Sequence, residues 1–144
     1  MKRELLQIVI DTNVFISALY SKKGASFKLL FDTDFKDFEI NLSVPLILEY
    51  EKIAKNQIER LGLPVDAIDS ILDMICRVGN RRDIFFLWRP FLRDPKDDHI
   101  LEVAIESQSK YIITYNISDF RGIDQFGIQA ISPKEFLILI GEMK

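Results

Sequence analysis

The sequence predicts an α/β fold with a mainly parallel central sheet. Short apolar runs typical of strands alternate along the chain with stretches that have helical periodicity. Strands separated by helices are typical of βαβ units, whose strands pair in parallel. The length of 144 residues, without a repeat or a linker-like stretch, predicts one domain over residues 1–144.

The first half of the chain predicts two strands and four helices. Residues 5–10 are almost entirely apolar, which is typical of a strand buried on both faces. Asp11 and Ser43 each follow an expected strand and are good N-caps for the helices after them. Gly62 and Pro64 break the helical pattern. The expected elements are strands at 5–10 and 38–42, and helices at 14–19, 26–31, 46–58 and 66–77.

The second half of the chain predicts two clear strands and two helices. An apolar run at 84–88 is compatible with a further strand, and a polar loop is expected at 90–98. Asp97 or Asp98 is the expected N-cap of the next helix. The remaining expected elements are a helix at 100–107, strands at 111–114 and 127–131, and a closing helix at 133–140.

Composition excludes several classes of protein. The chain has 19 basic and 22 acidic residues, so its net charge of −3 excludes a protein that coats nucleic acid through charge alone. One cysteine and one histidine cannot complete a tetrahedral zinc site. No apolar run reaches the roughly 18 residues of a membrane helix, and the N-terminus lacks a signal-peptide pattern, so a cytoplasmic location is expected. Cys76 lies in an apolar helical stretch and is expected to be buried.

Acidic residues lie just after the expected strands or at the starts of the helices that follow. In parallel sheets ligands bind beyond the carboxyl ends of the strands, so these acids are expected to gather at one edge. Clustered carboxylates repel one another unless a cation neutralises them, and an oxygen-only set suits Mg²⁺ or Mn²⁺. Acids at these points are also ordinary helix caps, so spacing alone leaves both interpretations open. The acids are Asp11, Glu49, Asp97 or Asp98, and Asp119.

Four segments, taken in order, resemble the motifs of the PIN-domain family. They are VIDTNVF at 9–15, SVPLILE at 43–49, DPKDDHILEVA at 94–104 and ITYNISDF at 113–120. The segment GIQAISPKEFL at 127–137 resembles the prokaryotic VapC-like subgroup, the toxin components of type II toxin–antitoxin systems.

This resemblance implies a three-layer α/β/α sandwich and a ribonuclease that depends on Mg²⁺ or Mn²⁺. It also implies an RNA substrate, a cognate antitoxin protein and a homodimer. The implied catalytic and metal-binding acids are Asp11, Glu49, Asp97 and Asp119. The positions implied to support these acids or the attacking water are Thr12, Asn13, Ser43, Thr114 and Asn116.

Two motif positions need a choice between neighbours. Many family members have an Asp where this chain has Asn116, and members that share the Asn pattern point to Asp119 as the ligand. In the third motif, which contains Asp94, Asp97 and Asp98, the offset to Ala104 selects Asp97. A rival hypothesis follows from Asn116: the chain is a PIN-fold module that binds RNA or protein through a weakened or inactive metal site.

Further side chains are candidates for contacts outside the acid cluster. The candidate RNA contacts are Lys22, Lys23, Arg93, Lys96 and His99. The aromatic residues Phe85, Phe86, Trp88 and Phe91 are candidates for base stacking or a dimer face, with core packing as the simpler expectation. The stripe Asp98, Glu102 and Glu106 has helical spacing and is expected to be a solvated face.

Overall fold

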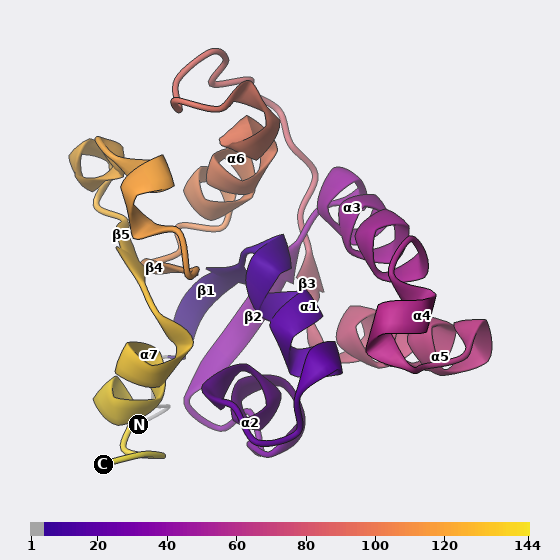
Figure 1. The fold of residues 1–144 in the computed structure, drawn as a ribbon. Helices are drawn as coiled ribbons and strands as arrows, with labels where there is room; N and C mark the ends of the chain where they lie inside the picture. Colours follow the sequence, from indigo (N-terminus) through magenta and orange to yellow (C-terminus); the bar gives the residue numbers. More distant parts are fainter. Residues whose placement is uncertain (1–4) are drawn as a thin grey trace.

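The computed structural model describes residues 5–144, in which five parallel strands form the central sheet (Figure 1). The strands are β1 (Leu6–Ile10), β2 (Phe38–Leu42), β3 (Asn80–Arg81), β4 (Tyr111–Ile113) and β5 (Gln129–Ile131). Their order across the sheet is β3-β2-β1-β4-β5, and every pairing is parallel. The chain builds outward from β1 to β3 and then returns to β4 beside β1. The carboxyl ends of β1 and β4 therefore flank the switch point at which such sheets bind ligands.

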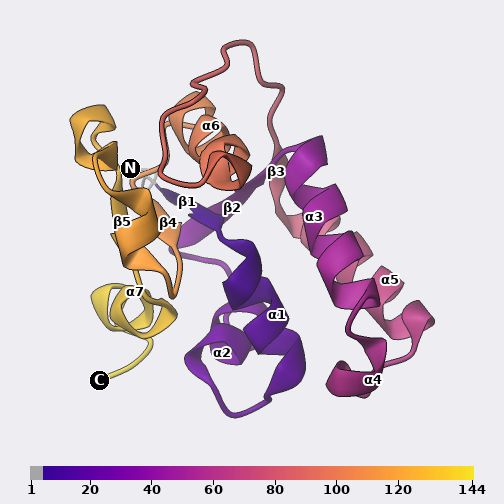
Figure 2. The same ribbon diagram turned by 45° about the horizontal axis from the view of Figure 1, so that its top comes forward.

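Helices cover both faces of the sheet, so the predicted α/β/α architecture is confirmed. Helix α6 packs on the central strands from one side, and α1, α2 and α7 lie on the opposite side (Figure 2). The helices α3, α4 and α5 stack beside the β3 edge (Figure 1). The helices are α1 (Thr12–Tyr20), α2 (Ala25–Phe31), α3 (Val44–Lys55), α4 (Ile58–Leu61), α5 (Val65–Val78), α6 (Asp98–Glu106) and α7 (Pro133–Leu139).

The core forms because the central strands are apolar on both faces. Ile8, Val9 and Ile10 of β1 are at most 1% exposed, as expected for a parallel strand covered from both sides. On the α1 side, Phe15 stacks on Tyr50 of α3, with ring centroids 4.6 Å apart. This stacking joins the two helices that follow β1 and β2, so it fixes the first residues of α1 relative to α3.

The structure corrects the prediction for residues 84–88. They form no strand but an irregular segment, in which Ile84 is partly buried against the core and residues 85–88 are exposed. The sheet edge is instead β3, a two-residue strand that the sequence analysis missed. The pattern of residues 84–88 is apolar, but a strand also needs a neighbour, and β2 is already paired by Asn80 and Arg81.

Cys76 is exposed, which contradicts the expected buried thiol. The buried face of α5 is formed by Ile68, Leu72 and Ile75. A residue next to Ile75 is rotated by about 100° around a helix of 3.6 residues per turn, so Cys76 leaves that face. None of the helices among residues 5–144 is long and apolar enough to cross a membrane.

Candidate metal centre

Asp11 follows β1 directly and is held by two donors at the sheet edge. Its side chain is 7% exposed and accepts hydrogen bonds from the Thr12 backbone N–H and the Thr114 hydroxyl, each at 2.8 Å. Burial raises the pKa of Asp11, these two hydrogen bonds oppose that shift, and the charges of Glu49 and Asp119 add to it. The net effect is a raised pKa. Asp11 therefore sits in a negative field that a cation would relieve.

Glu49 reaches the same edge from α3. Ser43 caps this helix by accepting the Leu46 N–H at 3.2 Å, which fixes the first turn. The Thr12 hydroxyl donates to Oε2 of Glu49, and His99 Nε2 lies 3.2 Å from Oε1. Burial would raise the pKa of Glu49, but the hydrogen bonds from His99 and Thr12 outweigh it, so the pKa is lowered. Glu49 is therefore held in its ionised form.

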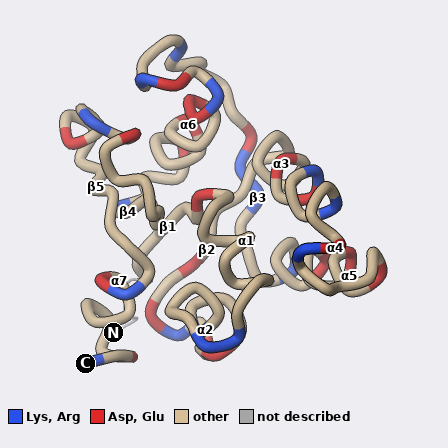
Figure 3. Tube along the Cα trace, viewed as in Figure 1, with Lys and Arg blue, Asp and Glu red and all other residues tan. Residues whose placement is uncertain are grey.

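Asp97 stands at the start of α6, opposite these two acids. Burial raises the pKa of Asp97 to about 6, with further contributions from the negative charges of other carboxylates. These carboxylates are Asp11, Asp94, Asp119 and Glu49, in order of effect. Figure 3 shows acidic positions at the starts of both α1 and α6. The four predicted ligand residues thus share one electrostatic environment, although they come from four separate segments.

Thr114 connects the end of β4 to the end of β1. Besides donating to Asp11, its hydroxyl oxygen accepts from the Asn116 backbone N–H at 2.9 Å and from Asn13 Nδ2 at 3.5 Å. Asn13 Oδ1 in turn accepts the Tyr115 N–H at 3.4 Å. The structure therefore gives Thr114 and Asn13 supporting contacts, while Asn116 contributes through its backbone and is itself exposed.

The donor chemistry of this cluster fits a hard divalent cation. Among residues 5–144, no three side chains of Asp, Glu, His or Cys stand close enough to enclose an ion as they are placed. Mg²⁺ keeps several waters and needs only one or two carboxylates directly. These acids therefore suit an ion that is held partly through water. Their oxygens are ligands for such an ion, and its positive charge would offset the burial and repulsion that raise the pKa of Asp97.

The predicted RNA contacts separate into three groups. Lys22 and Lys23 are exposed beyond the end of α1 opposite to Asp11, so the structure does not bring them to the acids. Arg93 and Lys96 are exposed on the connection that leads into α6. His99 contacts Glu49, so its position is within the acid cluster.

The predicted solvated stripe on α6 is wrong for two of its three residues. Asp98 and Glu102 are 0% and 2% exposed. Asp98 accepts the Leu92 N–H at 2.8 Å, and Glu102 accepts the Trp88 N–H at 2.9 Å and two groups of Arg89 at 2.8 to 3.2 Å. The groups that donate to Asp98 and Glu102 are mostly backbone N–H groups of an irregular segment. Backbone donors leave no pattern in the sequence, so the burial of these two acids could not be predicted from it.

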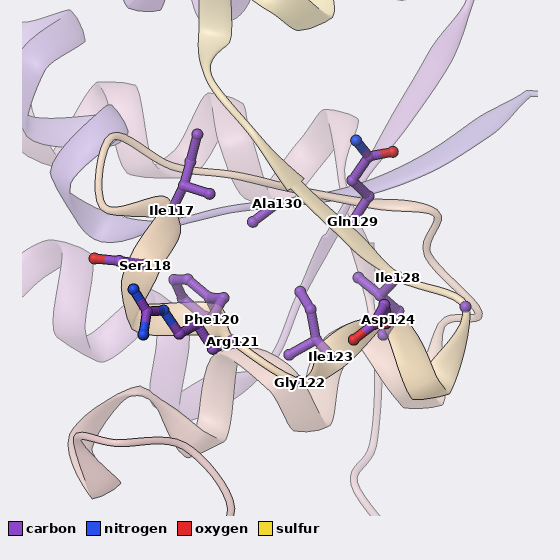
Figure 4. Close-up of a pocket in the computed structure, with 11 residues that line it drawn as sticks. Ile117, Ser118, Phe120, Arg121, Gly122, Ile123, Asp124, Ile128, Gln129 and Ala130 are labelled. Atoms are coloured by element: carbon purple, nitrogen blue, oxygen red, sulfur yellow. The ribbon is translucent and has the colours of Figure 1, made fainter.

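A cavity of about 880 Å³ lies apart from the acid cluster. It is lined by η2 (Ile117–Phe120), η3 (Ile123–Phe126) and β5 (Figure 4). Ser118 and Phe120 line this cavity, but Asp119 between them does not, and its charge acts on Asp11 and Asp97. The segment η2 therefore separates the cavity from the carboxylates.

Comparisons with known proteins match both the motifs and the fold. The model of the PIN domain family matches residues 7–118. A comparison with curated proteins gave no match. Among solved structures, the chain is similar to one in the crystal structure of VapBC2 from Rickettsia felis bound to a DNA fragment from their promoter. The TM-score is 0.59 at 14% identity, over 87% of this chain and 97% of that chain, so the likeness is one of fold.

Proposed function

The chain belongs to the PIN-domain family, and on this premise we propose that it is a ribonuclease that depends on Mg²⁺ or Mn²⁺. The observation that supports the proposal is the joining of Asp11 and Glu49 through Thr12, whose backbone N–H donates to Asp11 at 2.8 Å and whose hydroxyl donates to Glu49. Burial and neighbouring carboxylates also raise the pKa of Asp97 to about 6. Carboxylates whose pKa values are raised by burial and by neighbouring negative charges are typical of functional sites.

The proposed ligands are Asp11, Glu49, Asp97 and Asp119, acting directly or through water. When bound, a divalent ion supplies a hydroxide near neutral pH and stabilises the charge that develops on the phosphate oxygens. Thr114 holds Asp11 through its hydroxyl, and Thr12 and His99 hold Glu49. These three side chains fix the carboxylates before substrate arrives, which lowers the cost of organising the site during reaction.

We extend the proposal to a role as the toxin of a toxin–antitoxin pair in the cytoplasm. The resemblance of segment 127–137 to VapC-like toxins and the fold shared with a chain of VapBC2 support it. A small antitoxin protein and a second copy of this chain are the partners that this role requires. Co-expression of the protein with and without its neighbouring gene product tests the role, because a toxin should arrest growth only when expressed alone.

The nuclease proposal is tested by incubating purified protein with RNA in Mn²⁺ or Mg²⁺. Parallel reactions contain EDTA or the Asp11→Asn variant. Cleavage that disappears in both controls supports the proposal. A folded protein that binds RNA or protein but cuts no RNA would instead favour the rival hypothesis, a PIN-fold binding module with an inactive metal site.

A further inference from the structure

Residues 85–88, named here the aromatic loop, expose an unusual amount of apolar surface. Phe85, Phe86 and Leu87 are 76%, 71% and 69% exposed, and Trp88 is 40% exposed. They lie on the connection between β3 and α6, which arches over the region between α3 and α6 (Figures 1 and 2). Contiguous exposed apolar side chains of this kind mark sites of interaction.

The aromatic loop is anchored by the two buried acids of α6. Glu102 accepts the Trp88 N–H and forms an ion pair with Arg89 at 2.8 Å, while Asp98 accepts the Leu92 N–H. The rings of Trp88 and Phe91 also pack edge-on against Phe126, with centroids 5.3 and 5.2 Å away. The C-terminal end of the loop is therefore fixed by contacts with α6 and Phe126, while Phe85, Phe86 and Leu87 stay exposed.

A cavity of about 350 Å³ is lined by Leu87 of the aromatic loop and by His99 of α6. Its lining also includes two basic and two acidic side chains, those of Arg82, Arg89, Asp83 and Glu102. His99 contacts Glu49, so the cavity adjoins the proposed catalytic acids.

Arg82 is the basic group of this lining that can meet a phosphate, because Arg89 is already paired with Glu102 at 2.8 Å. Nε of Arg82 donates to Asn41 Oδ1 at 2.9 Å, which orients the guanidinium and leaves its Nη groups without a partner among residues 5–144. Residues 81–96 contain five basic and two acidic side chains in a chain whose net charge is −3. Figure 3 shows these charges along the connection from β3 to α6. Positive charge beside exposed aromatic rings is the combination that binds single-stranded nucleic acid.

We propose that the aromatic loop and this cavity bind a single-stranded segment of RNA next to the phosphodiester that is cut. Phe85 and Phe86 stack on bases, and Arg82 contacts a backbone phosphate. The inference rests on the proposed ribonuclease function and adds to it the place on this chain where unpaired bases are held. Bases in a duplex are stacked on each other, so their faces are not accessible to the loop.

The test measures RNA binding without cleavage. A fluorescein-labelled single-stranded RNA and a hairpin of equal length are titrated with protein in EDTA, with anisotropy as the measure of affinity. Trp88 is the only tryptophan of the chain, so its fluorescence reports independently on occupancy of the loop. The variants are Phe85→Ala/Phe86→Ala and Arg82→Ala. The control is Leu139→Ala, which alters an exposed apolar residue of α7 that is 53% exposed.

We expect the single-stranded RNA to bind more tightly than the hairpin and to quench Trp88 with a saturable curve. The double variant should lose about tenfold or more in affinity, since base stacking contributes strongly at such sites. Arg82→Ala should weaken binding and reduce its salt dependence. Leu139→Ala should bind like the wild type.

Wild-type affinity for single-stranded RNA in the double variant would overturn the inference. If that variant also loses a dimer in light scattering, the loop is a self-association surface instead. Cleavage in Mn²⁺ is measured separately, so wild-type protein that binds through the loop in EDTA but never cuts RNA would refute the ribonuclease and not the binding site.

Discussion

His99 Nε2 lies 3.2 Å from Glu49 Oε1, in a contact that joins the first turn of α6 to α3. The two side chains are 15% and 30% exposed. The second oxygen of Glu49 accepts from the Thr12 hydroxyl at the start of α1. Three helices therefore meet at one carboxylate, and each of its oxygens has its own partner.

Replacing His99 should loosen this carboxylate without disturbing the fold. We expect His99→Ala to weaken Mn²⁺ binding and slow RNA cleavage by about tenfold to 100-fold, because partners that orient a ligand have effects of that size. His99→Gln retains an N–H group with a similar reach and should recover much of both. Calorimetric titration with Mn²⁺ and cleavage rates measure the two effects. Equal losses of Mn²⁺ affinity and cleavage rate in both variants would show that the hydrogen bond from residue 99 to Glu49 does not cause these effects.

Asp11→Asn should abolish activity while leaving stability nearly unchanged. The substitution removes a proposed ligand, for which we expect a loss of cleavage of at least about 100-fold. It also relieves repulsion from Glu49 and Asp119, which offsets part of the disturbed hydrogen bonding with Thr114. Cleavage assays and thermal melts in EDTA check both statements. A large drop in melting temperature would mean that Asp11 is mainly a structural residue.

The metal-free protein should lose stability between about pH 4 and pH 6. Burial and neighbouring carboxylates raise the folded-state pKa of Asp97 from 3.8 to about 6, so folding favours the protonated form. Protonated Asp97 therefore contributes to the free energy of unfolding. The contribution is fully present below the pKa of Asp97 in the unfolded chain and is lost as the pH rises through its pKa in the folded protein. The melting temperature of the wild type minus that of Asp97→Asn, measured in EDTA, isolates it. A difference that stays constant or increases from pH 4 to pH 7 would contradict the raised pKa.

Divalent metal should stabilise the protein at pH 7. An ion that binds only the folded state raises stability in proportion to the logarithm of its concentration above its dissociation constant. We expect Mn²⁺ to raise the melting temperature of the wild type and to have much less effect on Asp97→Asn. Ca²⁺ and Mg²⁺ at equal concentration compare ions of different size. No shift with any of these ions would leave the proposed metal centre without support.

Glu102→Gln should destabilise the protein and release the aromatic loop. Glu102 is 2% exposed and holds both the Trp88 N–H and Arg89. Removing its charge should cost about 1–3 kcal/mol of stability, as for other buried groups whose hydrogen-bond partners are lost. Urea denaturation measures the loss, and acrylamide quenching of Trp88 measures the exposure of the loop. Glu106→Gln is the matched control on the same helix, and an equal effect there would exclude a specific anchor.

The architecture could be predicted from the sequence because each main element carries its own pattern. The apolar strand at the start, Asp11 after it and Ser43 at the next helix are local signals, and in the structure they are β1, the cap of α1 and the cap of α3. The parallel sheet follows from the alternation of strands and helices. The motif resemblance then selected four acids whose charges act on one another in the structure.

The sequence alone determined the fold class, the order of the main elements apart from β3, and the set of candidate acids, since these depend on local patterns and on short motifs. Only the tertiary structure decided that His99 contacts Glu49, that Asp98 and Glu102 are buried, and that residues 85–88 are exposed. A helical stripe of acids has the same spacing whether it faces water or a neighbouring backbone. Whether the stripe faces water or backbone depends on how distant segments of the chain pack. That packing determines the energy of a buried charge and the role of the residue that carries it.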